Sequence, residues 1–136
     1  MTLKKNKLLN LFKYRVLFFI LSRLLYIRIF KHRLGILELA GKFKPKNKNR
    51  KEFGPQWYYY YVTKILRFFN DNNCLNKNLI LFYLLSSYVS PAYSLIIGVR
   101  KKNDLESHCW IELNGLPQFE NHSESEKYEN IFSITN

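Results

Sequence analysis

The pattern of apolar and polar positions predicts helices in the first part of the chain. Residues 8–33 contain neither Pro nor Gly and are rich in Leu, Ile and Phe, which predicts one or two helical segments. Residues 57–69 repeat aromatic and aliphatic side chains at helical spacing, and residues 75–88 do the same. We expect the polar run Asn70–Asn73 to end the first of these two helices and to cap the second, which then begins at Cys74.

The last third of the chain has the pattern of strands. Residues 93–99 are apolar and β-branched, as in a buried strand. Residues 107–113 alternate between apolar and polar side chains, so that His108 and Trp110 share one face of a strand and Cys109 lies on the other. A charged turn is expected between these two strands.

A hairpin signal follows the second predicted strand. Asn114-Gly115 is the dipeptide most typical of a tight β-turn, and residues 116–120 are expected to form a third strand. From residue 122 on, acids and serines alternate and end in a short apolar patch at Ile131-Phe132. We therefore expect an α+β fold, with N-terminal helices followed by a helix that begins at Cys74 and packs on a small antiparallel sheet.

Positive charge is concentrated in the first part of the chain. The 136 residues carry a formal net charge of +12. Residues 1–56 hold 15 Lys and Arg against two acids, a net charge of +13, whereas residues 57–136 hold seven against eight, a net charge of −1. We therefore divide the chain into a basic helical extension with a loop, residues 1–56, and a nearly neutral core, residues 57–136. The charge predicts an anionic partner for the extension: an acidic peptide, an acidic protein face, nucleic acid or a membrane surface.

The N-terminal segment does not have the pattern of a secretion signal or a membrane span. Its apolar run, Val16–Ser22, is only seven residues long, and Arg23 and Arg28 interrupt every window of the roughly 20 apolar residues that a span needs. The basic residues are spread around the helix, which favours packing against the rest of the chain over contact with a membrane surface, and leaves such contact open. We expect a cytoplasmic protein in which Cys74 and Cys109 are reduced thiols.

Cys74, His108 and an acid after the hairpin form a candidate catalytic set. A cysteine at a helix start has its thiolate favoured by the helix dipole, and the free N–H groups there can form an oxyanion hole. A neutral histidine can take the thiol proton and later protonate the leaving amine. A third group usually orients the imidazole.

The segment from His108 to Gly115 resembles the His-Ala-Trp-Val-Glu-Val-x-Gly signature of the transglutaminase-like superfamily, with Cys109 in place of its Ala. Cys74-Leu75 before a helix, and Ile97–Arg100 before the signature, resemble one branch of that superfamily. This branch is the split leader peptidase of lasso-peptide biosynthesis, and the resemblance covers residues 57–121 with recognisable motifs.

The resemblance implies a papain-like fold in which Cys74 is the nucleophile and His108 the base. The third residue of the family is typically Asp on the strand after the hairpin; here Glu120 stands in that region, twelve residues after His108. The implied reaction removes the leader from a ribosomally made lasso precursor, before a separate cyclase closes the ring. A small separate leader-binding protein would deliver the precursor, and no metal or cofactor is needed.

Three alternatives stay open beside this interpretation. The fold could serve as a non-catalytic scaffold that binds a peptide. The charged run at residues 42–51 could make the chain a basic nucleic-acid-binding module; it has no zinc-finger spacing and no RNA-recognition motif, so we expect no nucleic-acid partner. A zinc site would have to combine Cys74, His108, Cys109 and His122, which lack the close ligand spacing of structural zinc sites.

The register of the hairpin decides whether Glu120 can reach His108. A strict two-residue turn would place Glu120 opposite Cys109, on the face away from His108. A three-residue loop or a bulge would place Glu120 opposite Trp110, on the face of His108. We therefore expect such a loop or bulge, with Asn121 and Glu112 as the next candidates for the third residue.

Overall fold

Helices come first along the chain and an antiparallel sheet follows, in the order that the sequence predicts. The computed structural model describes residues 2–30, 33–43, 45, 53–71 and 73–135. Its elements are α1 (Thr2–Phe30), α2 (Ile36–Gly41), α3 (Pro55–Phe68), α4 (Cys74–Tyr88), β1 (Tyr93–Lys101), β2 (Leu105–Leu113), β3 (Leu116–Gln118), α5 (His122–Ser125) and β4 (Glu129–Thr135). The predicted α+β architecture is confirmed, including a helix that begins at Cys74.

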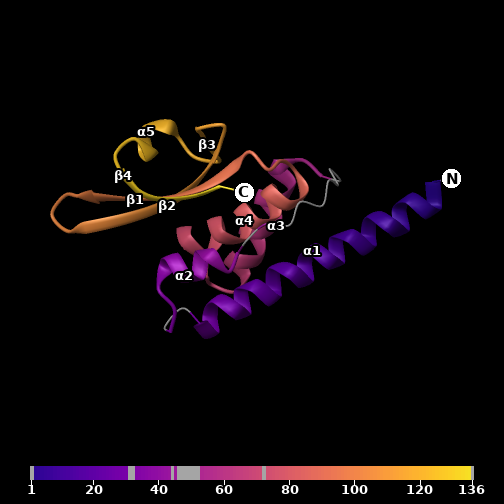
Figure 1. Cartoon of the computed structure of the whole chain (residues 1–136). Coiled ribbons are helices and arrows are strands. Elements are labelled where there is room, and N and C mark those ends of the chain that lie inside the picture. Colours follow the sequence, from indigo (N-terminus) through magenta and orange to yellow (C-terminus); the bar gives the residue numbers. More distant parts are fainter. Residues whose placement is uncertain (1, 31–32, 44, 46–52, 72, 136) are drawn as a thin grey trace.

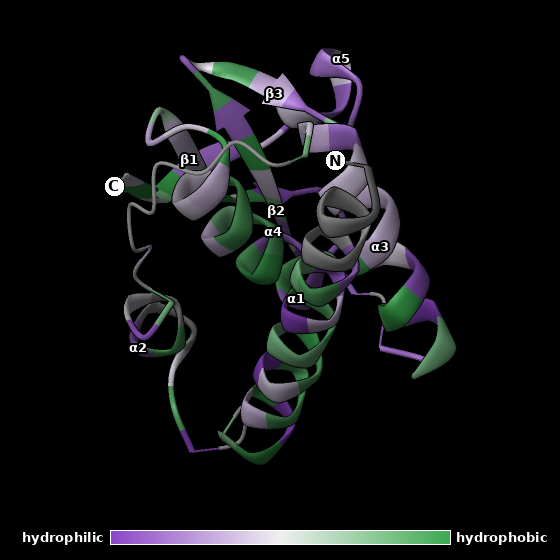
Figure 2. Ribbon diagram, turned by 90° about the vertical axis from the view of Figure 1, so that its right-hand side faces the viewer, coloured by the Kyte–Doolittle hydropathy of each residue, from purple (hydrophilic) through white to green (hydrophobic). Residues whose placement is uncertain are grey.

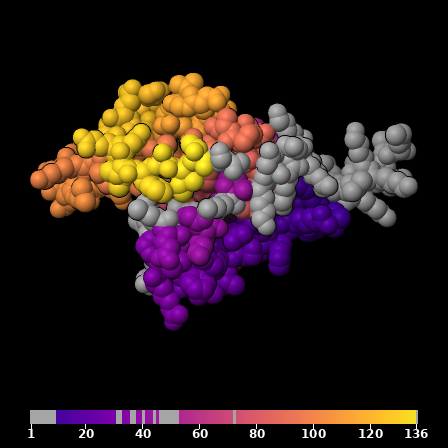
Figure 3. Space-filling view, in the orientation of Figure 1, coloured from indigo at the N-terminus to yellow at the C-terminus, as the bar shows by residue number. Residues whose placement is uncertain are grey.

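The sheet lies between the long helices and α5 (Figure 1). Its strand order is β3-β2-β1-β4, and all three neighbouring pairs are antiparallel. Helix α4 packs on one face of β1 and β2, and α1 and α3 contact α4 from its other side. Residues 79–85 of α4 are all buried because neighbours cover the helix on both sides, and Figure 2 shows this central helix as mainly apolar. Figure 3 shows β4 on the surface and the tip of the β1–β2 hairpin projecting from the body.

Helix α1 contributes one of its sides to the same core as α3 and α4. Its buried positions recur every three or four residues: Phe12, Val16, Ile20, Leu24 and Ile27. The opposite side is apolar as well and is exposed at Leu11, Tyr14, Phe18, Leu25 and Ile29. Apolar residues on both sides explain why the charges do not gather on one face. Among the helices that the structure describes, none is both long and apolar enough to span a lipid bilayer.

Only part of the charged loop between α2 and α3 is described. Lys44, Lys46 and Lys48, which carry much of its predicted charge, lie outside the described residues. Before them, Phe43 is fully buried in the core. After them, the Phe53 ring stacks on Trp57 with centroids 4.0 Å apart. Aromatic packing therefore fixes both described ends of the loop.

Strand β4 is an element that the sequence pattern does not indicate. It pairs with β1, and a bulge lies between Ile97 and Gly98 of β1. Most of its side chains are exposed, and only Phe132 and Ile134 pack against the core. An edge strand of this kind buries little apolar surface, so the sequence shows only the short patch around Ile131-Phe132.

Gly98 allows close packing on the face of the sheet that α4 does not cover. It lies opposite His108 in the β1–β2 register. A Cβ at this position would lie 2.8 Å from the ring of Trp110 and 2.9 Å from Cβ of Tyr128. Only a residue without a side chain therefore leaves room for both groups.

We predict that Gly98→Ala lowers the free energy of unfolding by about 1–3 kcal/mol, because the added methyl group overpacks the contact with Trp110 and Tyr128. Urea unfolding followed by circular dichroism measures this change. Gly35→Ala is the matched control, since a Cβ at Gly35 meets nothing within 4 Å. Equal unfolding midpoints for the two variants would contradict the prediction.

Candidate active site

The two faces of β2 have different neighbours. Cys109 and Ile111 belong to the core that α4 covers. His108 and Trp110 occupy the opposite face, as the alternation predicts. There the His108 ring lies 5.8 Å from the Trp110 ring and 5.2 Å from the ring of Tyr128, which follows α5. Trp110 is almost fully buried, whereas about a quarter of the His108 side chain is exposed. The histidine is therefore held between aromatic rings and still accessible.

His108 and Glu120 are in direct contact. The Nε2 atom of His108 lies 2.9 Å from Oε2 of Glu120, and both side chains are largely shielded from solvent. A contact between this carboxylate and a ring nitrogen is the geometry that the sequence leads us to expect, and it is present. Within the described part of the chain, Nδ1 of His108 has no hydrogen-bond partner and Oε1 of Glu120 is buried without one. The carboxylate can thus fix the imidazole through Nε2 while Nδ1 stays available.

The contact forms by a different route from the one predicted. The expected three-residue loop or bulge is wrong: Leu113 pairs with Leu116, so the turn consists of Asn114 and Gly115 alone. These two residues have φ of 52° and 80°, the left-handed pair that a tight hairpin turn requires. A strand continued in this register would carry Glu120 to the face away from His108.

Phe119 redirects the chain and so brings Glu120 to His108. Strand β3 ends at Gln118, and Phe119 has φ of 65°, a left-handed conformation that is unfavourable for a bulky residue. Its ring stacks on Tyr59 of α3, with centroids 4.7 Å apart and planes 7° apart. This packing offsets the backbone strain and fixes the direction in which Glu120 leaves the sheet.

Cys74 occupies the first position of α4, as predicted. The Asn73 side chain caps the helix by accepting a hydrogen bond from the backbone N–H of Asn76 at 2.8 Å. The Asp71 carboxylate accepts from the Asn76 side chain at 2.6 Å and forms an ion pair with Arg28 of α1 at 3.0 Å. The loop that presents Cys74 is therefore held by the long N-terminal helix as well as by its own cap.

Cys74 lies near the edge of β2 where Glu120 also lies. Asn78, one turn after Cys74, donates a hydrogen bond from its side chain to the carbonyl of Cys109. Burial raises the pKa of the Cys109 thiol far above its ordinary value, and the nearby Cys74 and Glu120 raise it further. In the regions that the structure covers, Cys74 makes no hydrogen bond to His108. The structure thus joins His108 to Glu120, whereas Cys74 is near Cys109 on the other face of β2.

The other candidates of the sequence have different surroundings. Glu112 accepts a hydrogen bond from the indole N–H of Trp110 at 2.9 Å, so it supports the ring under His108 and does not touch the histidine. His122 pairs with Glu126 of the same short segment. Among the described residues, no three His, Cys, Asp or Glu side chains are grouped so that they could hold a metal ion. The four residues considered for a zinc site are therefore not gathered into one.

Two residues of this site were not indicated by the sequence. Tyr128 covers His108, and Phe119 turns the chain toward it. Phe119 lies near the end of the segment expected to form the third strand, and Tyr128 lies in the polar segment that follows residue 122. Neither aromatic residue carries a local signal for its role, because each role depends on a contact with a distant part of the chain.

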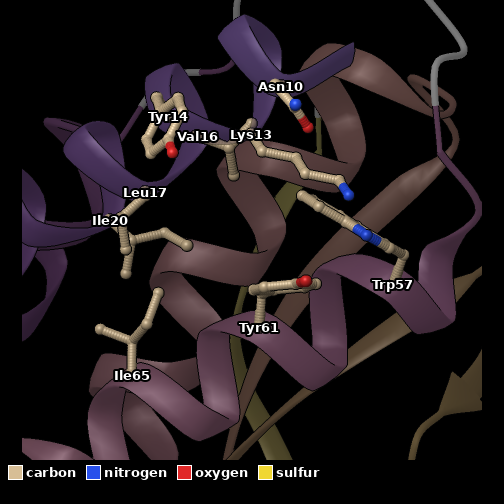
Figure 4. Close-up of a pocket in the computed structure, with 9 residues that line it drawn as sticks. All are labelled: Asn10, Lys13, Tyr14, Val16, Leu17, Ile20, Trp57, Tyr61 and Ile65. Carbon is tan, nitrogen blue, oxygen red and sulfur yellow. The ribbon is translucent and has the colours of Figure 1, made fainter. Parts of the chain in front are cut away.

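An apolar pocket of about 210 Å³ lies between α1 and α3, away from these residues (Figure 4). Figure 4 shows Lys13 of α1 reaching toward Trp57 of α3, with Tyr61 and Ile65 further along the same helix. Its lining contains no Cys, His, Asp or Glu. The pocket therefore shares no residue with the candidate catalytic set of Cys74, His108 and Glu120.

A comparison with protein families matches most of the chain. A model of the transglutaminase-like superfamily matches residues 21–133. No curated protein and no solved structure gives a significant match. The matched range runs from the middle of α1 into β4, and it contains Cys74, His108 and Glu120.

We predict that iodoacetamide labels Cys74 much faster than Cys109 in the folded protein. Cys74 is partly exposed, whereas Cys109 is buried and its raised pKa suppresses the reactive thiolate. Mass spectrometry of digested samples gives the rate at each thiol. In urea the two rates should converge, and Cys74→Ser should remove the fast reaction. Equal labelling rates of Cys74 and Cys109 in the folded protein would contradict this prediction.

Proposed function

The chain belongs to the transglutaminase-like superfamily, and from this premise we propose that it is a cysteine peptidase. Cys74 is the nucleophile, His108 is the general base and acid, and Glu120 orients the imidazole. The observation that carries the proposal is the 2.9 Å contact between Nε2 of His108 and Glu120, which leaves the other ring nitrogen for a thiol. The position of Cys74 at a capped helix start supports the role of nucleophile.

The proposed reaction proceeds through a thioester. Nδ1 of His108 takes the thiol proton, and the Cys74 sulfur attacks the carbonyl carbon of the peptide bond. Free backbone N–H groups at the start of α4 stabilise the oxyanion. The carbon–nitrogen bond breaks, and the leaving amine takes the proton from His108. Water, deprotonated by His108, then attacks the thioester, which releases the acid and restores the thiol.

The proposal requires the Cys74 sulfur to approach Nδ1 when the substrate binds. Catalytic hydrogen bonds are often long or misaligned in free enzymes and tighten in the substrate complex. Asn78, one turn after Cys74, already ties this end of α4 to the backbone of β2, the strand that carries His108.

The substrate that we propose is the leader region of a lasso-peptide precursor. Support comes from the motifs around Cys74 and His108 that resemble the split leader peptidases. A small leader-binding protein would present the precursor, a separate cyclase would use the freed amine, and the reaction would take place in the cytoplasm. The basic segment, residues 1–56, would dock the leader, its binding protein or an anionic surface.

A non-catalytic scaffold of the same fold is the second candidate. The observation that favours it is the missing hydrogen bond between Cys74 and His108 in the described residues. A scaffold would bind the precursor and leave it intact. Cleavage by the purified chain with its binding protein therefore separates the two candidates.

We predict that Cys74→Ala lowers the cleavage rate of a leader-bearing precursor by about 10³-fold or more, because the nucleophile is lost. Mass spectrometry of the products gives the rate, and circular dichroism shows whether the variant folds. Cys109→Ala is the matched control and should keep most of the activity, because its buried thiol takes no part in the reaction. Cleavage by Cys74→Ala near the wild-type rate would reject the assignment.

The role of Glu120 predicts a graded response to substitution. Glu120→Gln should lower kcat sharply, because the neutral amide does not stabilise the imidazolium that forms in the reaction. Glu120→Asp should keep part of the activity, since the charge remains and only the reach is shorter. The pH dependence of kcat/KM for each variant tests the coupling to His108. Equal loss in both variants with an unchanged pH profile would assign Glu120 a purely structural role.

A further inference from the structure

A groove of about 530 Å³ follows the exposed side of α3. Its lining residues lie three or four positions apart and therefore form one face of the helix. They are Gln56, Tyr59, Tyr60, Thr63, Lys64 and Arg67. This face is distinct from the one that contacts α1, and it meets the buried side of the helix at Thr63.

The groove is positively charged. Lys64 and Arg67 are exposed, and in the part of the chain that the structure describes neither forms an ion pair with a carboxylate. The Lys64 ammonium lies 3.5 Å from the Tyr60 hydroxyl and 5.6 Å from the centre of that ring. Tyr60 itself is more than half exposed. Free cations beside exposed aromatic rings suit a ligand that carries both carboxylate and apolar groups.

Thr63 provides an independent indication of a ligand. Its side chain is 92% buried, so it lies at the floor of the groove between exposed neighbours. Its hydroxyl oxygen is buried and has no hydrogen-bond partner among the described residues. A buried hydroxyl without a partner is costly and uncommon. A ligand oxygen in the groove would accept a hydrogen bond from this hydroxyl once the Thr63 side chain turns toward the groove.

The groove connects to the candidate active site through Tyr59. This ring lines the groove, and its stacking partner Phe119 directly precedes Glu120. The ammonium group of Lys77 lies 5.6 Å from the centre of the Tyr59 ring, and Lys77 is three residues after Cys74 on α4. An extended peptide bound along α3 would therefore pass over Tyr59 toward Cys74 and His108.

We propose that this groove binds an acidic segment of the peptide substrate. A Glu or Asp carboxylate lies between Lys64 and Arg67 and accepts a hydrogen bond from the Thr63 hydroxyl, while the Tyr59 and Tyr60 rings contact the apolar side chains beside it. The inference depends on the proposed peptidase function and specifies its substrate class. Nucleic acid, which also suits cations and aromatic rings, is an outcome that the test distinguishes.

Binding to the full chain with Cys74→Ala tests the groove independently of cleavage. The probes are a fluorescein-labelled decapeptide of two Glu, four Leu and four Ser residues, and the same peptide with both Glu replaced by Gln. Fluorescence anisotropy should give a Kd about tenfold lower for the Glu peptide, because charge-assisted hydrogen bonds to Lys64 and Arg67 are lost in the Gln peptide. Lys64→Gln with Arg67→Gln should remove this preference.

Two control variants make the test specific. Lys101→Gln with Lys102→Gln removes the same charge at the β1–β2 turn and should keep the tenfold preference. Thr63→Val should weaken binding of the Glu peptide several-fold and leave the unfolding midpoint unchanged or higher, because the hydroxyl has no partner among the described residues in the free protein.

The outcomes separate the groove from the peptidase. Two results would overturn the inference. One is a preference for the Glu peptide that remains when Lys64 and Arg67 are both replaced, and the other is a preference that is lost just as much in the control variant at Lys101 and Lys102. A labelled decathymidylate that binds more tightly than the Glu peptide would also overturn it. If the variant without Lys64 and Arg67 loses this binding, the groove binds nucleic acid. Confirmed peptide binding with no cleavage by the wild-type chain would leave the groove in place and reject the peptidase.

Discussion

The alternation of side chains along β2 is the constraint on which the arrangement of the site depends. Because Cys109 must face α4 to complete the core, His108 is forced onto the opposite face of the same strand. An acid that arrives from the neighbouring strand in regular register would point to the wrong side. The left-handed turn at Phe119 resolves this conflict, and Tyr59 of α3 provides the packing that holds the turn.

The N-terminal helix has a similar supporting role for the cysteine. Arg28 of α1 pairs with Asp71 and also donates a hydrogen bond to the carbonyl of Phe69 at 2.7 Å. Both partners lie in the loop that leads to Cys74. Arg28, one of the basic residues of α1, thus helps to fix the start of α4, although more than two fifths of the Arg28 side chain is exposed. A basic residue of α1 therefore helps to position the candidate nucleophile.

Local patterns predict the parts of this site that depend on neighbouring residues in the chain. The cap at Asn73, the start of α4 at Cys74 and the face occupied by His108 all follow from spacing over a few residues. The turn at Phe119 cannot be predicted in this way, because its strained conformation is held by a contact with α3, 60 residues earlier in the chain. The same holds for Tyr128, whose place over His108 depends on how β4 pairs with β1.

The run of four tyrosines in α3 shows how one helix contributes to four different surroundings. At 100° per residue, successive side chains must point in different directions. Tyr58 is buried in the core, Tyr59 stacks on Phe119, Tyr60 lies exposed in the basic groove, and Tyr61 lines the pocket with α1. A tyrosine suits each place because its ring packs against apolar neighbours while its hydroxyl can face a polar group or solvent. Helix α3 therefore supplies the packing that fixes Phe119 and, through it, Glu120. The same helix forms the proposed substrate groove, so peptide binding along α3 and the geometry at His108 depend on one structural element.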